Sequence, residues 1–218
     1  MMITCAFLLA IISVILFGCA SPPYIPPQLP DAAILTFTNK AEIEVILQGF
    51  KNAEDCSGGR LNFNDRRKLG PGEKTTISIA PEEEFSFRFH AANKPYFRYG
   101  CLMPATFTPQ EGIAYFSTFD LIDLHCDDDS HNTDLHYAKR LGSFRYVTSN
   151  YSLWRNVEDP LERGACGGEW AASTSGELVF PLCYVSITRM KNGNVVREPS
   201  FTLRTQIQPW LESGPSCQ

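Results

Sequence analysis

The stretch Phe85-Ser86-Phe87-Arg88-Phe89-His90 has the clearest periodicity in this chain of 218 residues. Three phenylalanines alternate with three polar residues, and successive side chains of a β-strand point to opposite faces of its sheet. The alternation therefore predicts a strand with one aromatic and one polar face. We expect the aromatic face to lie in the core of a sheet. The alternative is that the three phenylalanines line a ligand cavity.

Alternating runs of Val, Ile, Phe and Thr lie on both sides of this stretch. On the N-terminal side they predict strands at 34–38, 42–47, 60–63 and 74–80, with turns at 39–40 and 69–72. On the C-terminal side they predict strands at 179–190, 195–197 and 202–205. Asn192-Gly193 between two such runs predicts a tight hairpin.

The segment 127–172 is the least regular part of the chain. It holds Asp127-Asp128-Asp129 and Gly164-Ala165-Cys166-Gly167-Gly168, and it shows no sustained alternation. We expect a long irregular insertion here, with a short helix at 135–141. The fold expected for residues 32–218 is a single mainly β domain, an antiparallel β-sandwich of about 190 residues that is large enough to bury a real core.

An uncharged, largely apolar run begins near Ile3 and ends in Leu16-Phe17-Gly18-Cys19. Its length suits the h-region of a signal peptide and is short for a membrane span. Cysteine directly after a Leu-x-Gly triplet resembles the lipobox of bacterial lipoproteins. The resemblance implies a signal peptide at 1–18 and acylation of Cys19. Because Ala20 rather than Asp follows, it also implies an anchor in the outer membrane.

A second interpretation of the N-terminus stays open. The first residues carry no Lys or Arg, and bulky Phe17 lies two positions before the cysteine. An ordinary signal peptide cut after Ala20 would give a soluble secreted or periplasmic protein.

Residues 19–31 are expected to form the lipidated N-terminus and a tether. Five prolines within nine residues favour an extended polyproline II spacer. At about 3.1 Å per residue, such a spacer would hold the domain roughly 30–40 Å from the lipid.

Six cysteines remain when the signal cysteine and Cys19 are set aside. An even number in an exported chain predicts three structural disulfides, and six cysteines allow 15 pairings. A pairing of Cys56 with Cys101 is our hypothesis, because both flank the first strand-rich block. No Cys-x-x-Cys occurs, which argues against a redox site or a zinc ribbon. The disulfide candidates are Cys56, Cys101, Cys126, Cys166, Cys183 and Cys217.

A looser resemblance extends over about a hundred residues. A cysteine precedes a Phe-x-Pro-x-x-Gly-x-x-Tyr turn and strand, and a later cysteine opens another strand. The matching residues are Cys101, Phe107, Pro109, Gly112, Tyr115 and Cys183. This pattern resembles that of small uncharacterised periplasmic lipoproteins, and it implies a β-sandwich of the transthyretin-like or immunoglobulin-like kind, here with 127–172 inserted.

The segment 125–136 holds three of the four histidines and four carboxylates. Imidazoles and carboxylates at this density could bind Zn²⁺, or Ca²⁺ through oxygen alone. The spacing matches neither an EF-hand loop nor His-Glu-x-x-His. The alternative is a solvated acidic loop. The candidate metal ligands are His125, Asp127, Asp129, His131, Asp134 and His136.

No catalytic signature is present, whether a nucleophile elbow, Ser-x-x-Lys or a phosphate-binding loop. The net charge of −5 without a basic stripe argues against nucleic acid as a partner. We expect a membrane-anchored envelope lipoprotein that is not an enzyme, takes no cofactor and acts as a binding or structural module toward an envelope protein. The alternative is a periplasmic metal-binding protein or enzyme that uses the loop 125–136.

Overall fold

The computed structural model describes residues 23–50, 60–63, 68–92, 100–125, 141–146, 156–157 and 179–203. Every element assigned within these ranges is a β-strand. The same ranges contain no helix that is long and apolar enough to cross a membrane. The described chain is therefore mainly β, as the alternation predicts.

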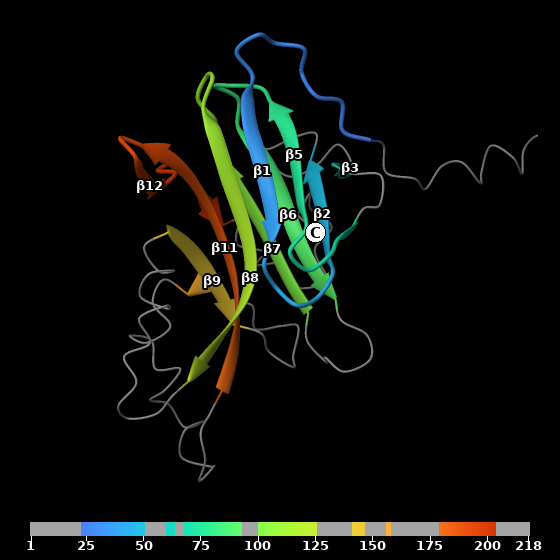
Figure 1. The fold of residues 1–218 in the computed structure, drawn as a ribbon. Helices are drawn as coiled ribbons and strands as arrows, with labels where there is room; N and C mark the ends of the chain where they lie inside the picture. Colours follow the sequence, from blue (N-terminus) through green and yellow to red (C-terminus); the bar gives the residue numbers. More distant parts are fainter. Residues whose placement is uncertain are drawn as a thin grey trace, which may run out of the picture.

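The strands form two sheets that face each other (Figure 1), an arrangement consistent with a β-sandwich. One sheet has, in spatial order, β10 (Asn156–Val157), β9 (Gly142–Tyr146), β11 (Val179–Lys191), β8 (Ala114–His125), β1 (Ala33–Asn39) and β5 (Lys74–Ile79), with β12 (Asn194–Arg197) paired to β11. The other has β13 (Thr202–Leu203), β7 (Gly100–Phe107), β6 (Phe85–Ala92), β2 (Val45–Phe50) and β3 (Arg60–Asn62), with β4 (Lys68–Leu69) paired to β2.

The sheets are mostly antiparallel, but one pair in the middle of the first sheet is not. β1 runs parallel to β8, with Ile34 opposite Ala114, and antiparallel to β5. Parallel neighbours need a long connection. Here the chain between β1 and β8 passes through β6 and β7 of the other sheet before it returns in the direction of β1. The expectation of a wholly antiparallel sandwich is therefore wrong at this pair.

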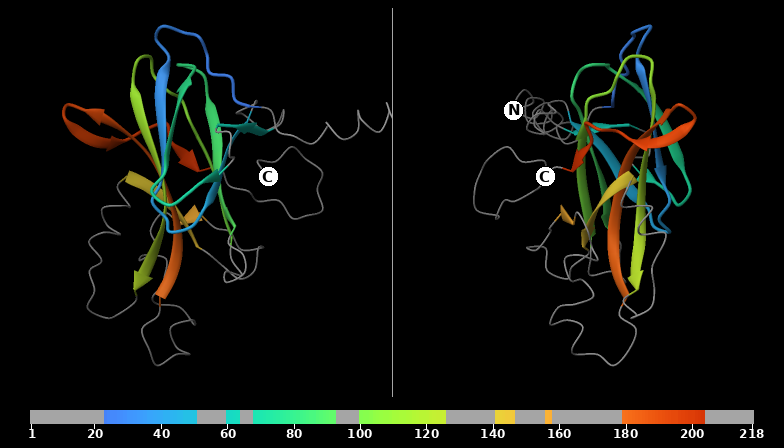
Figure 2. Two further views of the ribbon diagram at one scale, coloured as in Figure 1. Left: turned by 45° about the vertical axis from the view of Figure 1, so that its right-hand side comes forward. Right: turned by 90° about the vertical axis from the view of Figure 1, so that its left-hand side faces the viewer.

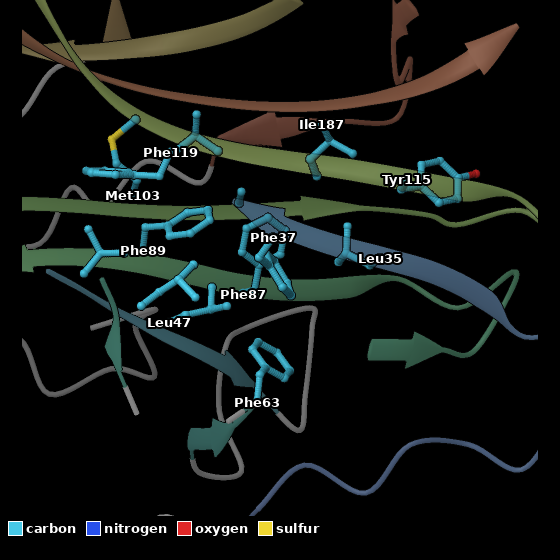
Figure 3. Close-up of a cluster of buried hydrophobic side chains, with 14 of the residues drawn as sticks. Leu35, Phe37, Leu47, Phe63, Phe87, Phe89, Met103, Tyr115, Phe119 and Ile187 are labelled. Carbon is cyan, nitrogen blue, oxygen red and sulfur yellow. The ribbon is translucent and has the colours of Figure 1, made fainter. Parts of the chain in front are cut away.

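The aromatic stripe forms the core of the domain. Phe87 and Phe89 are fully buried, and each packs edge-to-face against Phe37 of β1, with ring centroids 4.9 and 5.9 Å apart (Figure 3). Each buried phenylalanine contributes about 1.5–3 kcal/mol to folding. The prediction that this face lies in a core is confirmed for Phe87 and Phe89. Ser86 and Arg88 point to the opposite face and are buried as well.

The predicted hairpin at Asn192-Gly193 is also confirmed. Lys191 pairs with Asn194 across a two-residue loop that joins β11 to β12. Both loop residues have positive φ, 52° and 77°, as a type I′ turn requires.

Asn39 lies where the chain leaves the first sheet for the second. It is fully buried, and its Nδ2 donates hydrogen bonds to the carbonyls of Ile43 (2.7 Å) and Leu69 (2.9 Å). Its Oδ1 accepts one from the amide of Ala41 (3.0 Å), which is the geometry of an Asx turn. The predicted turn at Asn39-Lys40 is therefore a crossing between sheets rather than a hairpin, since β1 and β2 do not pair with each other.

The segment predicted as an irregular insertion contains strands. β9 and β10 lie within 127–172 and extend the first sheet beyond β11. The expectation is wrong at these two places, because strands this short leave little alternation to detect. The predicted helix at 135–141 lies outside the described residues except for its last residue.

Candidate functional site

The predicted metal ligands fall almost wholly outside the described residues. His125 is the last residue of β8, and its side chain is not described; Asp127, Asp129, His131, Asp134 and His136 lie in an undescribed range. Within the described ranges, His, Cys, Asp and Glu side chains form no group of three that could hold a metal ion. The metal hypothesis for 125–136 stays a prediction.

Of the predicted cysteine sites, one has a described side chain. Cys183 lies on β11, is fully buried in the core and is disulfide-bonded. Cys101 belongs to β7, but its side chain is not described, and the remaining candidates, Cys56, Cys126, Cys166 and Cys217, lie outside the described residues with Cys19. The pairing of Cys56 with Cys101 therefore stays a hypothesis.

A pocket of about 310 Å³ opens at one end of the six-stranded sheet. Three separate parts of the chain form it: the segment before β1, the end of β2 with β3, and the turn between β5 and β6. The residues that line it are Tyr24, Ile25, Pro27, Phe50, Leu61, Ala80, Glu83, Glu84, Phe85 and Ser86.

Tyr24 positions the N-terminal wall of this pocket. Its amide donates a hydrogen bond to the carbonyl of Asn62 on β3 (2.8 Å), and its hydroxyl donates one to the carbonyl of Ser78 on β5 (2.8 Å). β3 and β5 are edge strands of different sheets. Tyr24 therefore joins the two sheets along one side of the domain. The described chain begins beside β3, in dark blue, and runs over the top of the domain to β1 in Figure 1 and in the left view of Figure 2.

The ring of Tyr24 packs edge-to-face against two phenylalanines. Its centroid lies 5.2 Å from that of Phe63 and 6.2 Å from that of Phe85. Burial among these rings raises the pKa of Tyr24 to about 12. The neutral phenol is the form that this site favours, because a phenolate would lose its hydration there.

The expectation of a spacer that stands free of the domain is wrong at Tyr24. The segment 23–32, which we call the N-terminal segment, is held at both ends. Pro23 bridges to Asn62 at one end, and the carbonyl of Asp31 accepts a hydrogen bond from the amide of Gly112 (3.1 Å) at the other. The sequence signal for this docking is an aromatic residue within a proline-rich stretch.

The pocket walls combine apolar surface with acidic groups. Phe85, the first residue of the aromatic stripe, lines the pocket and also packs against the core, whereas Phe87 and Phe89 are fully buried. Glu83 and Glu84 stand beside it in the exposed turn before β6. The Ser86 hydroxyl donates a hydrogen bond to the hydroxyl of Thr106 (2.9 Å). The pocket wall therefore places carboxylates next to an aromatic ring.

Arg88 supports the wall of the pocket from the polar face of β6. Its Nε and Nη2 donate to Oε1 of Gln48 on β2 (3.1 and 2.8 Å), and its guanidinium carbon lies 5.7 Å from the centre of the Phe50 ring. A guanidinium over an aromatic face is stabilised by the ring quadrupole. The contact fixes Phe50, which lines the pocket.

A second polar cluster lies beside the turn between β7 and β8 and was not predicted from the sequence. Glu198 and Arg189 form a buried ion pair in which Nε and Oε2 are 3.3 Å apart, without the alignment of a hydrogen bond. Arg189 also donates to Oε1 of Gln110, and the amide of Gln110 donates to the hydroxyl of buried Tyr115 (2.8 Å). Ser200 donates to Oε1 of Glu198 (2.9 Å). These contacts tie the segment after β12 to the turn between β7 and β8.

Neither a model of a known protein family nor a curated protein matches this chain. No function can therefore be carried over from a relative. The functional argument rests on the N-terminal sequence, the docked segment and the pocket beside it.

Proposed function

We propose that the protein is a lipoprotein of the cell envelope, anchored in the outer membrane through Cys19, whose domain is a non-catalytic binding or structural module. The observation that carries the proposal is the succession along the chain of an apolar run, the lipobox-like Leu16-Phe17-Gly18-Cys19, and a segment that packs onto the domain from Tyr24. This order suits a chain whose leader is removed and whose new end is attached to lipid close to a folded domain.

The fold that goes with this proposal is a disulfide-stapled β-sandwich of the transthyretin-like or immunoglobulin-like kind. Two facing sheets with one aromatic core and the bonded, buried Cys183 support it. Three disulfides would suit an oxidising compartment outside the cytoplasm.

The pocket is the contact site that we assign to a protein partner in the envelope. It offers the rings of Phe50 and Phe85 and the carboxylates of Glu83 and Glu84 within one concave surface. Aromatic anchors beside charged groups are the usual composition of interaction sites.

The intact mass of the protein extracted from membranes tests the anchor. We expect a chain that begins at Cys19, carries acyl chains and lacks six hydrogens relative to the fully reduced form. A bare chain that begins at Ser21 would make it a soluble exported protein, and the anchor would be excluded.

Co-purification after mild cross-linking in membranes tests whether the pocket contacts an envelope protein. The charge-introducing variant Leu61→Arg in the pocket is compared with Val195→Arg, which changes an exposed residue on β12. We expect loss of one envelope partner, at least fivefold, with Leu61→Arg alone. Equal recovery with both variants would exclude the pocket as the contact site.

A metal-binding protein or enzyme is the alternative, and the density of His and Asp at 125–136 favours it. A stoichiometric metal that is lost on changing His131 and His136, with a lower melting temperature after chelation, would support it. An unchanged melting temperature with chelator would exclude it.

A further inference from the structure

The docking of the N-terminal segment limits how far the domain can stand from its lipid. Tyr24 is fixed to both sheets by its amide, its hydroxyl and its ring. Three residues separate Cys19 from Pro23, where the docked segment begins. A fully extended chain spans at most about 3.5 Å per residue, so the four steps from Cys19 to Pro23 reach about 14 Å. If docking began only at Asp31, the twelve steps from Cys19 would reach about 42 Å.

We propose that the pocket end of the domain lies against the bilayer surface, with the N-terminal segment between them, rather than at the end of a long spacer. The inference rests on the proposed lipid attachment at Cys19 and adds the orientation of the domain. The outward side of the N-terminal segment contacts the phospholipid headgroup layer, whereas the pocket, of which this segment forms one wall, remains the contact site of the envelope protein. The argument for the contact with the headgroup layer is the length of chain between the lipid and the docked Tyr24.

The side chains of the N-terminal segment suit this placement. Ile25 is 83% exposed, the largest exposed fraction among the large apolar residues of the described chain, and Leu29 is 49% exposed. Both lie among prolines, whose fixed φ keeps the segment extended. Apolar side chains that project from a restrained segment next to a lipid anchor can enter the interfacial region of a bilayer.

The charges on the pocket rim select the kind of headgroup. Glu82, Glu83 and Glu84 are exposed in the turn that faces Ile25 and Pro27 across the pocket. Anionic headgroups would repel this turn, whereas zwitterionic headgroups present an ammonium group to it. We therefore expect the pocket end to approach phosphatidylcholine vesicles closely.

Energy transfer to labelled lipids tests the orientation. The membrane-extracted protein is reconstituted into phosphatidylcholine vesicles that contain acceptor-labelled headgroups. A fluorescent amino acid replaces Glu83 in one sample and Met190 in the other. Met190 is the matched control, because it is exposed on the β11–β12 hairpin, which projects from the side of the domain opposite β3 in Figure 1. We expect at least twofold higher transfer from position 83 than from position 190.

A variant that loses the docking of Tyr24 tests whether the short link from Cys19 is what keeps the pocket end close to the bilayer. Tyr24→Ala removes the ring and the hydroxyl and should lengthen the link, so transfer from position 83 should fall toward that from position 190. Tyr24→Phe keeps the ring and should retain most of the difference. If Tyr24→Ala does not fold, the comparison of energy transfer from positions 83 and 190 in the otherwise unchanged protein still tests the orientation of the domain.

The intact mass of each preparation distinguishes a wrong orientation of the domain from a missing lipid anchor. Equal transfer from positions 83 and 190, in a protein of acylated mass, would overturn the orientation and leave the lipid anchor intact. A mass without acyl chains would overturn the anchor, and the orientation with it.

Discussion

Asn39 provides three side-chain hydrogen bonds at a corner from which water is excluded. In Asn39→Leu, which keeps the volume, the carbonyls of Ile43 and Leu69 and the amide of Ala41 would lose these partners while still buried. Each buried polar group left without a partner costs about 1–3 kcal/mol. We expect the free energy of unfolding, measured in urea, to fall by about 3 kcal/mol.

The control for this prediction is Asn194→Ala. Asn194 is exposed on β12, and its Nδ2 donates one long hydrogen bond to the carbonyl of Asn192 (3.4 Å). Exposed positions of this kind change stability by less than about 0.5 kcal/mol. Similar losses in the two variants would show that the buried corner does not depend on Asn39.

Tyr24 gives the domain a dependence on alkaline pH. Its pKa is about 12 in the folded protein and 10 in the unfolded chain. The folded state therefore keeps the proton to a higher pH, so the stabilisation is complete below pH 10 and is lost as the pH rises from 10 to 12. Tyr24→Phe should cost about 1 kcal/mol at neutral pH through the lost bond to Ser78.

Urea titrations of the two proteins at pH 8, 10 and 11.5 measure this effect. The stability of Tyr24→Phe should decline less steeply above pH 10 than that of the unchanged protein, because the variant lacks the Tyr24 phenol and the two proteins are otherwise the same. If the free energy of unfolding declined equally in the two proteins, the assignment of a raised pKa to Tyr24 would be contradicted.

At the scale of elements, the sequence predicts strands better than it predicts their partners. The alternation at Phe85–His90 and the turn at Asn192-Gly193 are local signals, and both give the right element. The parallel pairing of β1 with β8 has no local signal, because the side-chain period is the same in parallel and antiparallel strands. The short β9 and β10 are missed for lack of length.

The ion pair of Arg189 and Glu198 joins β11 to the segment that follows β12. Their side chains are 14% and 4% exposed. Removing one partner leaves the other charge buried without compensation, which costs about 3–5 kcal/mol, whereas replacing both by apolar residues costs much less. We expect Glu198→Leu to lower stability by about 3 kcal/mol and Arg189→Met/Glu198→Leu to lower it by less than the sum of the single changes.

A double-mutant cycle in urea measures the coupling, which we expect to exceed about 1 kcal/mol. The matched pair is Lys68 with Glu44, 2.8 Å apart but more than half exposed on both sides. Exposed pairs couple by about 0–1 kcal/mol. A coupling at Arg189–Glu198 no larger than that at Lys68–Glu44 would contradict a structural role for the buried pair.

At the scale of the whole molecule, the core is predictable and the pocket is not. Aromatic alternation identifies Phe87 and Phe89 as core residues before any pairing is known. The pocket needs Tyr24, Leu61 and Phe85 from three distant parts of the chain, and their meeting depends on how the edges of the two sheets are closed. Composition at the N-terminus favours an extended segment, and tertiary contacts decide that it docks.

The disulfide at Cys183 makes the stability of the core depend on the oxidation state of the molecule. It is fully buried on β11 and disulfide-bonded. Loss of a native disulfide costs about 2–5 kcal/mol, largely by freeing the unfolded chain. Reductant should therefore lower the urea midpoint of the unchanged protein, and Cys183→Ala should already show part of this loss under oxidising conditions. Adding reductant to Cys183→Ala should then shift its midpoint by less.

Val185 lies two residues further along the same strand and is fully buried. The variant Val185→Ala therefore distinguishes the cost of a cavity in the core from the cost of losing the disulfide. This variant loses packing alone, so reductant should shift its midpoint as much as that of the unchanged protein. If reductant shifted the midpoint of Cys183→Ala as much as that of Val185→Ala, the Cys183 disulfide would contribute nothing to stability, and the effect of reductant would come from other disulfides.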